Sequence, residues 1–144
     1  MPTITIYFMP KPKPTHNNPT VLIAEDDHLI TKAYVASLKR SGFKTIHASD
    51  GLEALWESKR KNPDIILLDI KMPFINGFKV LKELKANPKT KDIPVLLLSN
   101  SLRDEYLVSA QSLGAKEFLI KLDLSIDTLV QKIMTYTKEH TAPA

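Results

Sequence analysis

Five short apolar runs recur along this chain, and each is followed by a segment in which apolar residues have helical spacing. Four of the runs are almost continuously apolar, which is typical of parallel strands covered by helices on both faces. The second run, KTIHA, is more polar and predicts a strand at the edge of the sheet. The predicted strands are Val21–Ala24, Lys44–His47, Ile65–Leu68, Val95–Leu98 and Glu117–Ile120.

The segments between these runs carry apolar residues three or four positions apart, which is the spacing of an amphipathic helix. We expect Tyr34 and Trp56 to contact the core rather than a ligand. The apolar positions of the predicted helices are Ile30, Ala33, Tyr34 and Leu38 in residues 28–40, then Leu52, Leu55 and Trp56, then Phe78, Leu81 and Leu84, and finally Ile126, Leu129, Val130, Ile133 and Met134.

Polar residues at expected helix ends support these assignments. Asp50 with Glu53 resembles a capping box, and Ser101 with Asp104 predicts a similar cap for the fourth helix. Gly114 fits the carboxyl-terminal cap of that fourth helix. Five strand–helix units of this kind predict a doubly wound α/β fold with right-handed crossovers and a parallel sheet of order 2-1-3-4-5. Ligands of such sheets bind at the switch point, here between strands 1 and 3.

Composition narrows the class of protein. The chain has 144 residues, 43% hydrophobic and 25% charged, and no cysteine, so disulfides and cysteine-based zinc sites are excluded. No apolar run approaches the length that spans a bilayer, and no signal peptide is evident, so we expect a cytoplasmic protein without membrane contact. The net charge is +4, but the lysines are dispersed, and we expect no direct nucleic-acid binding.

The chain divides into three expected regions. Residues 1–18 contain four prolines and alternate Lys with Pro, which predicts an extended or disordered leader. Within it, Thr3–Phe8 alternates polar and apolar residues and could instead pair as an edge strand. Residues 19–139 form the expected single domain, and residues 140–144 the expected flexible tail.

Complementary chemical groups end four of the predicted strands. Glu25 and Asp26 follow TVLIA, Asp69 ends DIILLD, Ser99 follows PVLLL, and Lys121 follows EFLI. The carboxyl ends of parallel strands meet at one edge of the sheet, so we expect these side chains to converge. A carboxylate can attack a phosphoryl group, a hydroxyl can hydrogen-bond a phosphoryl oxygen, and a lysine can neutralise another. The combination predicts an aspartyl-phosphate site.

The acidic residues also predict a magnesium site. Clustered carboxylates repel one another, and Mg²⁺ prefers oxygen ligands while keeping several waters. Asp26 and Asp69 are the expected protein ligands, with Glu25 holding a metal-bound water and the backbone carbonyl of Lys71 supplying a further oxygen. His28 and His47 are expected to be ordinary helix and strand residues, because neither has a second histidine at ligand spacing.

Residues 20–139 resemble the receiver domain of two-component response regulators. The resemblance is carried by LIAEDD, IILLDIKMP followed by NG, PVLLLS and LGAKEFLIK. It implies a flavodoxin-like receiver fold and a signalling switch rather than a conventional enzyme. A histidine kinase or histidine phosphotransfer protein would donate the phosphoryl group, and binding to a downstream effector would then change. The implied roles are Asp69 as phosphoacceptor, Glu25 and Asp26 as acidic pair, Ser99 and Lys121 as switch hydroxyl and lysine, and Phe118 as switch aromatic.

Two residues depart from the pattern of this family. Leu122 follows Lys121 where proline is usual, so we expect a trans peptide bond there, because a cis bond before leucine costs about 2.5–4 kcal/mol. With the loop rearranged, Lys121 is expected to approach Asp69 less closely. Asn100 is larger than the usual residue and is expected to restrict the coupling to Phe118.

Two other functions compete with the one that this resemblance implies. A haloacid-dehalogenase-like phosphohydrolase needs Asp-x-Asp at the nucleophile, and Lys71 stands at the third position. A degenerate receiver that serves as a phosphorylation-independent docking module is the alternative that Leu122 leaves open. No effector domain follows, so we expect a stand-alone receiver or one cut from a larger protein. We expect its output through helix 4, strand 5 and helix 5, including Glu105, Tyr106, Lys116 and Phe118.

Overall fold

The computed structural model describes residues 18–141 and contains one parallel five-stranded sheet. Its order is β2-β1-β3-β4-β5, which confirms the predicted order and the switch point between β1 and β3. The expected leader up to residue 17, including its possible strand Thr3–Phe8, and residues 142–144 lie outside the described residues. The strands are β1 (Thr20–Ala24), β2 (Lys44–Ala48), β3 (Ile65–Asp69), β4 (Val95–Ser99) and β5 (Glu117–Ile120).

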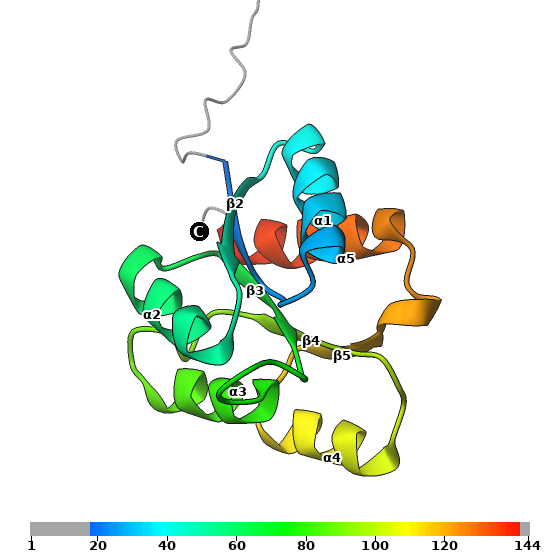
Figure 1. Cartoon of the computed structure of the whole chain (residues 1–144). Helices are drawn as coiled ribbons and strands as arrows, with labels where there is room; N and C mark the ends of the chain where they lie inside the picture. Colours follow the sequence, from blue (N-terminus) through cyan, green and yellow to red (C-terminus); the bar gives the residue numbers. More distant parts are fainter. Residues whose placement is uncertain (1–17, 142–144) are drawn as a thin grey trace, which may run out of the picture.

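Helices cover both faces of the sheet, as a parallel sheet requires. Figure 1 shows α1 and α5 together on one side and α2, α3 and α4 on the other. A short 3₁₀ turn, η1, links β5 to α5. No helix of the described residues is long and apolar enough to cross a membrane. The bounds are α1 (His28–Arg40), α2 (Gly51–Lys61), α3 (Gly77–Ala86), α4 (Asp104–Ser112), η1 (Lys121–Asp123) and α5 (Ile126–Thr141).

Successive strand residues point to opposite faces, so the strands feed two separate core clusters. Leu22, Ile66 and Leu68 join the cluster beneath α2, α3 and α4, whereas Ile23 and Leu67 join the cluster beneath α1 and α5. All five of these side chains are fully buried. Burial of both faces leaves the two ends of the strands as the places where polar side chains meet solvent.

The expected core positions of the first two helices need correction. Tyr34 is buried as predicted, but Trp56 is 65% exposed. The buried residues of α2 are instead Gly51, Ala54 and Ser58. The approach is close, because a Cβ on Gly51 would lie 2.4 Å from the backbone oxygen of Ile75. Small residues therefore occupy the buried face of α2, Leu55 packs against the core at its margin, and Leu52 and Trp56 turn outward.

Side chains on the other helices show smaller shifts. Ala33 is exposed, and Thr31 takes its place on the buried face of α1, where its hydroxyl donates to the backbone oxygen of Asp27. Leu52 and Met134, both expected in the core, are 55% and 42% exposed. The central positions of the predicted stripes, such as Leu38 on α1 and Ile133 on α5, are nevertheless fully buried.

The predicted helix caps are confirmed at two of three positions. The carboxylate of Asp50 accepts from the backbone N–H of Glu53 at 2.8 Å, and Gly114 has φ 90° after α4. The predicted pairing of Ser101 with Asp104 is wrong, since α4 begins after Arg103 without a side-chain cap. The backbone carbonyl and N–H of Ser101 are both hydrogen-bonded to Ser99 instead.

Candidate functional site

Acidic and basic side chains meet in a hollow at the carboxyl edge of the sheet. Pairing of Ala24 with Leu68, and of Asp69 with Leu98, brings the ends of β1, β3 and β4 level with one another. The hollow has a volume of about 410 Å³. It is lined by Glu25, Asp26, Asp27, Ile30, Asp69, Lys71, Asn100 and Lys121. The structure thus brings together the acidic residues and the lysine that the sequence predicted.

Three carboxylates form the centre of this hollow. Glu25, Asp26 and Asp69 each place one carboxylate oxygen within 4.8 Å of the others. Glu25 and Asp69 are buried, with 1% and 4% exposure, whereas Asp26 is exposed. An all-oxygen donor set that is open to solvent on one side suits Mg²⁺, which binds through few carboxylates and retains waters. The residues present therefore fit a divalent cation.

Lys121 is the counter-ion of the buried carboxylates. Its Nζ lies 2.6 Å from Glu25 Oε1 and 3.0 Å from Asp69 Oδ2. The expectation that Leu122 would hold Lys121 away from Asp69 is therefore wrong. Turn η1 leaves Leu122 86% exposed, while the stem of Lys121 points inward to two carboxylates. No peptide bond among the described residues is cis, as predicted for the bond before Leu122.

The pKa values of this cluster reflect burial and charge pairing. Burial raises the pKa of Glu25 to about 6, against the lowering effect of hydrogen bonds from Lys121 and the Asp27 N–H. Burial alone would lower the pKa of Lys121, but its hydrogen bonds to Glu25 and Asp69 outweigh burial and raise it. One lysine thus faces three carboxylates, and the surplus of negative charge favours a further cation.

Ser99 ends the neighbouring strand, and among the described residues its hydroxyl is hydrogen-bonded to Ser101 and not to Asp69. Its side chain is buried, and its Oγ donates to the backbone oxygen of Ser101 at 2.7 Å. Asn100 is exposed and lines the acidic hollow rather than the core. Phe118 is partly buried against the cluster beneath α2, α3 and α4. The expected movements of Ser99 and Phe118 remain predictions.

The backbone around the acidic cluster is fixed by two residues of different kinds. A Cβ on Gly77 would lie 2.5 Å from the Asp69 backbone oxygen, so glycine lets the β3–α3 loop pack closely against Asp69. His47, predicted to be an ordinary strand residue, places Nε2 2.9 Å from the Glu25 backbone oxygen, which fits donation from the ring N–H. In the sequence, the polar character of strand β2 was the one feature that indicated a role for His47 beyond packing.

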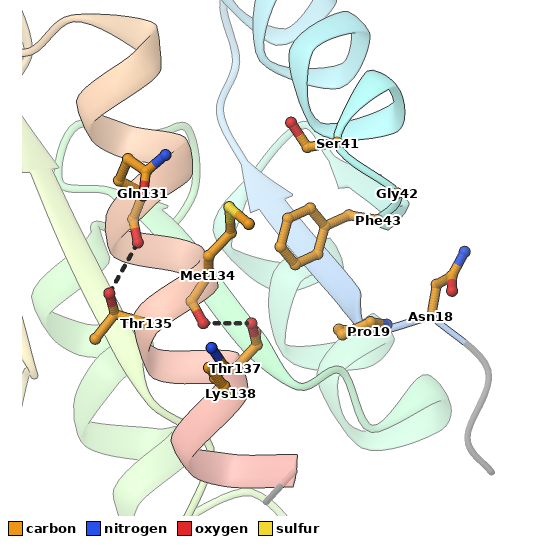
Figure 2. Close-up of a pocket in the computed structure, with 10 residues that line it drawn as sticks. All are labelled: Asn18, Pro19, Ser41, Gly42, Phe43, Gln131, Met134, Thr135, Thr137 and Lys138. Atoms are coloured by element: carbon orange, nitrogen blue, oxygen red, sulfur yellow. Dashed lines mark hydrogen bonds between the residues drawn. The ribbon is translucent and has the colours of Figure 1, made fainter. Parts of the chain in front are cut away.

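A further hollow among the described residues lies away from the acidic cluster. Figure 2 shows it between the start of β1, the α1–β2 turn and α5, with Phe43 and Met134 facing each other across it. Its volume is about 490 Å³. None of its lining residues carries a carboxylate, so it lacks the cluster of oxygen ligands that the acidic hollow has.

Comparisons with known proteins agree with this geometry. The family description "Response regulator receiver domain" matches residues 21–134. The transcriptional regulatory protein PrrA of Mycobacterium bovis is 36% identical over 104 residues, covering 72% of this chain but 44% of PrrA. The chain therefore spans less than half of that relative's length. The polar-differentiation response regulator DivK of Brucella ovis is 32% identical over 119 residues, which cover 81% of this chain and 94% of DivK.

A solved structure extends the likeness to three dimensions. The Mn²⁺-bound form of the response regulator Rcp1 is 30% identical, with a TM-score of 0.74, and the match covers 88% of this chain and 99% of Rcp1. The sheet order, the acidic hollow and the match over residues 21–134 all indicate the same family. This chain belongs to the response regulator receiver domain family.

Proposed function

We propose that the chain is a cytoplasmic, phosphorylation-dependent switch that accepts a phosphoryl group on Asp69. A histidine kinase or a histidine phosphotransfer protein is the proposed donor, and a downstream effector protein the proposed receiver of the signal. One observation carries the proposal: three carboxylates lie within 4.8 Å of one another, and Lys121 Nζ lies 3.0 Å from Asp69. Buried carboxylates without catalytic use would be a costly arrangement.

Few residues would take part in the transfer of the phosphoryl group to Asp69. A carboxylate oxygen of Asp69 bonds to phosphorus as the phosphorus–nitrogen bond of the donor phosphohistidine breaks, and the donor imidazole takes up a proton. Lys121 then neutralises charge on the phosphoryl oxygens as a compact point charge. Catalysis of this kind is mainly positioning and electrostatic stabilisation. The chain promotes its own modification and is not a conventional enzyme.

Mg²⁺ is the proposed cofactor, and the donor set supports it. Asp26 and Asp69 would hold the ion directly, the Lys71 backbone carbonyl would add an oxygen, and Glu25 would hold a metal-bound water. The ion would supply positive charge for the phosphoryl oxygens. The Mn²⁺-bound structure of the related regulator Rcp1 supports a divalent cation in a receiver of this kind.

Output is proposed to follow from the release of Ser99. In the unmodified protein Ser99 is hydrogen-bonded to Ser101, so turning toward a phosphoryl oxygen would break that contact and shift the β4–α4 loop. Phe118 would then turn further inward. In this way the local change of charge at Asp69 would bias an element that has two conformations. The surface of α4, β5 and α5 would change, including Glu105, Tyr106 and Lys116.

The docking-module alternative has weaker support. It depended on Leu122 disturbing the lysine, yet Lys121 contacts both Glu25 and Asp69. The experiment that tests the proposal is incubation with acetyl phosphate and Mg²⁺ followed by intact-mass measurement. Asp69→Asn should abolish the phosphoryl adduct, and Asp123→Asn, at an exposed aspartate, should not. An adduct on Asp69→Asn at the wild-type rate would refute the assignment.

A further inference from the structure

The short loop that carries the acidic pair is bound to strand β2 at both backbone groups of one residue. Residues 25–27 alone connect β1 to α1. The Glu25 N–H donates to the backbone oxygen of Ala48 at 3.1 Å, which continues the pairing of β1 with β2 by one further bond. His47, the residue before Ala48, places its Nε2 2.9 Å from the Glu25 backbone oxygen. Strand β2 therefore holds the first residue of the loop in place.

The surroundings of the His47 ring assign a hydrogen to Nε2. Thr31 Oγ1 lies 3.4 Å from this nitrogen and donates its own hydrogen to the Asp27 backbone oxygen at 2.9 Å. Toward His47 the Thr31 hydroxyl can therefore only accept, as the Glu25 carbonyl does. Because both neighbours of Nε2 are acceptors, a neutral ring must carry its hydrogen on Nε2. His47 is thus a donor, and its shorter contact is with Glu25.

This hydrogen bond acts on the residue that follows Glu25. The Glu25 carbonyl belongs to the peptide unit that joins Glu25 to Asp26. A peptide unit is planar, so a donor fixed on its oxygen sets the plane from which the Asp26 side chain leaves. Asp26 is exposed, and among the described residues no hydrogen bond or ion pair holds its carboxylate. On the other side, the Asp27 carboxylate caps the first turn of α1. The direction of the Asp26 carboxylate therefore depends on the backbone on both sides.

We propose that His47 is a positioning residue for the divalent cation, which it serves by directing the Asp26 carboxylate into the acidic hollow. This inference rests on the proposed magnesium site. Lys121 pairs with Glu25 and with Asp69, so the loop backbone is what brings the third carboxylate within 4.8 Å of those two. Groups that orient metal ligands through hydrogen bonds typically change metal affinity by about 10–100-fold when they are lost.

Binding of Mn²⁺, measured as loss of the free-ion signal in electron paramagnetic resonance, tests the proposal without phosphoryl transfer. His47→Leu removes the donor while keeping a bulky side chain, and it should weaken Mn²⁺ binding by about tenfold. His47→Gln keeps an N–H donor near the position of Nε2 and should restore most of the affinity. His28→Leu is the matched control, because it removes an exposed imidazole whose ring centre lies 6.3 Å from that of His47. It should leave Mn²⁺ affinity unchanged.

The possible results separate this inference from the magnesium site itself. If His47→Leu binds Mn²⁺ as tightly as wild type, the positioning role is wrong while the magnesium site stands. Equal weakening by His47→Gln would assign the effect to packing of the ring, and equal weakening by His28→Leu would assign it to any loss of imidazole near the loop. Either result would overturn the role of the Nε2 hydrogen bond. A wild-type protein that binds no Mn²⁺ would refute the magnesium site and this inference with it.

A second measurement on the wild-type protein needs no variant and therefore does not depend on whether His47→Leu folds. Long-range ¹H–¹⁵N nuclear magnetic resonance spectra distinguish the two nitrogens of an imidazole ring. At a pH at which the ring is neutral, His47 should carry its hydrogen on Nε2. A hydrogen on Nδ1 instead would leave Nε2 unable to donate to Glu25 and would overturn the proposal.

Discussion

Replacing Lys121 with methionine tests the electrostatics of the acidic hollow. The Lys121 side chain is 8% exposed, and the side chains of its partners Glu25 and Asp69 are 1% and 5% exposed. Removing one partner of a buried ion pair leaves an uncompensated charge and costs about 3–5 kcal/mol. The free energy of unfolding should therefore fall by about that amount at neutral pH without Mg²⁺. A loss of this size is a large share of the stability of a typical domain.

The same variant also tests how Lys121 affects the binding of Mg²⁺. Without the lysine, the three carboxylates should bind Mg²⁺ more tightly, because a competing cation is gone. A ligand at about 100 times its dissociation constant stabilises the folded state by about 2.7 kcal/mol. Urea unfolding followed by circular dichroism, with and without Mg²⁺, should show the ion stabilising Lys121→Met more than wild type.

Lys132 supplies a matched control. Its Nζ lies 2.9 Å from Glu117 Oε1, but the two side chains are 32% and 24% exposed. Partly solvated ion pairs contribute about 0.2–1 kcal/mol to stability. Lys132→Met should therefore lower the free energy of unfolding only slightly, and Mg²⁺ should not change the size of this effect. If Lys121→Met is no less stable than Lys132→Met, the reasoning about the buried cluster is refuted.

Three further predictions follow from the same geometry. Asp26→Ala should relieve repulsion and stabilise the metal-free protein while weakening Mg²⁺ binding, and unchanged affinity in a Mg²⁺ titration would refute its role as ligand. Burial raises the pKa of Glu25 from 4.5 to about 6, so the folded state keeps a proton that the unfolded chain has released. Metal-free stability should therefore fall as pH rises through this window, and Glu25→Gln should flatten that slope in urea titrations. Phe74→Gly should stabilise the fold by about 0.5–1 kcal/mol, because relief of about 1–2 kcal/mol of backbone strain exceeds the entropic cost of glycine; a loss of stability in thermal unfolding would contradict the strain.

The sequence predicted the fold well because its main signals are local and strong. Four almost continuous apolar runs indicated covered strands, and the polar KTIHA run was the expected edge. Each strand except the second ends in a residue of distinct chemistry, so the parallel arrangement alone predicted which side chains would converge. The prediction of which side chains converge therefore depended only on geometry that all doubly wound sheets share.

Errors arose where the packing of neighbours decides the outcome. Trp56 has the right spacing for a core residue, but the tight approach of Gly51 to Ile75 turns α2 so that small residues face inward. Ser101 has the right spacing for a cap, but Ser99 occupies its backbone groups. Attraction between Lys121 and two carboxylates outweighed the loop change expected from Leu122. These outcomes depend on contacts that no local pattern contains.

The contacts of Lys121 also determine when, during synthesis of the chain, the buried carboxylates gain their counter-ion. The lysine is 96 residues from Glu25 and 52 from Asp69 along the chain. A ribosome makes the carboxylates first and the lysine last, so a growing chain carries the acidic residues for most of its synthesis without their counter-ion. Because β5 must join the edge of the sheet to deliver Lys121, a truncated chain that ends before β5 should be unable to build the acceptor site. The proposed acceptance of a phosphoryl group on Asp69 would therefore require a chain that has been made at least as far as Lys121.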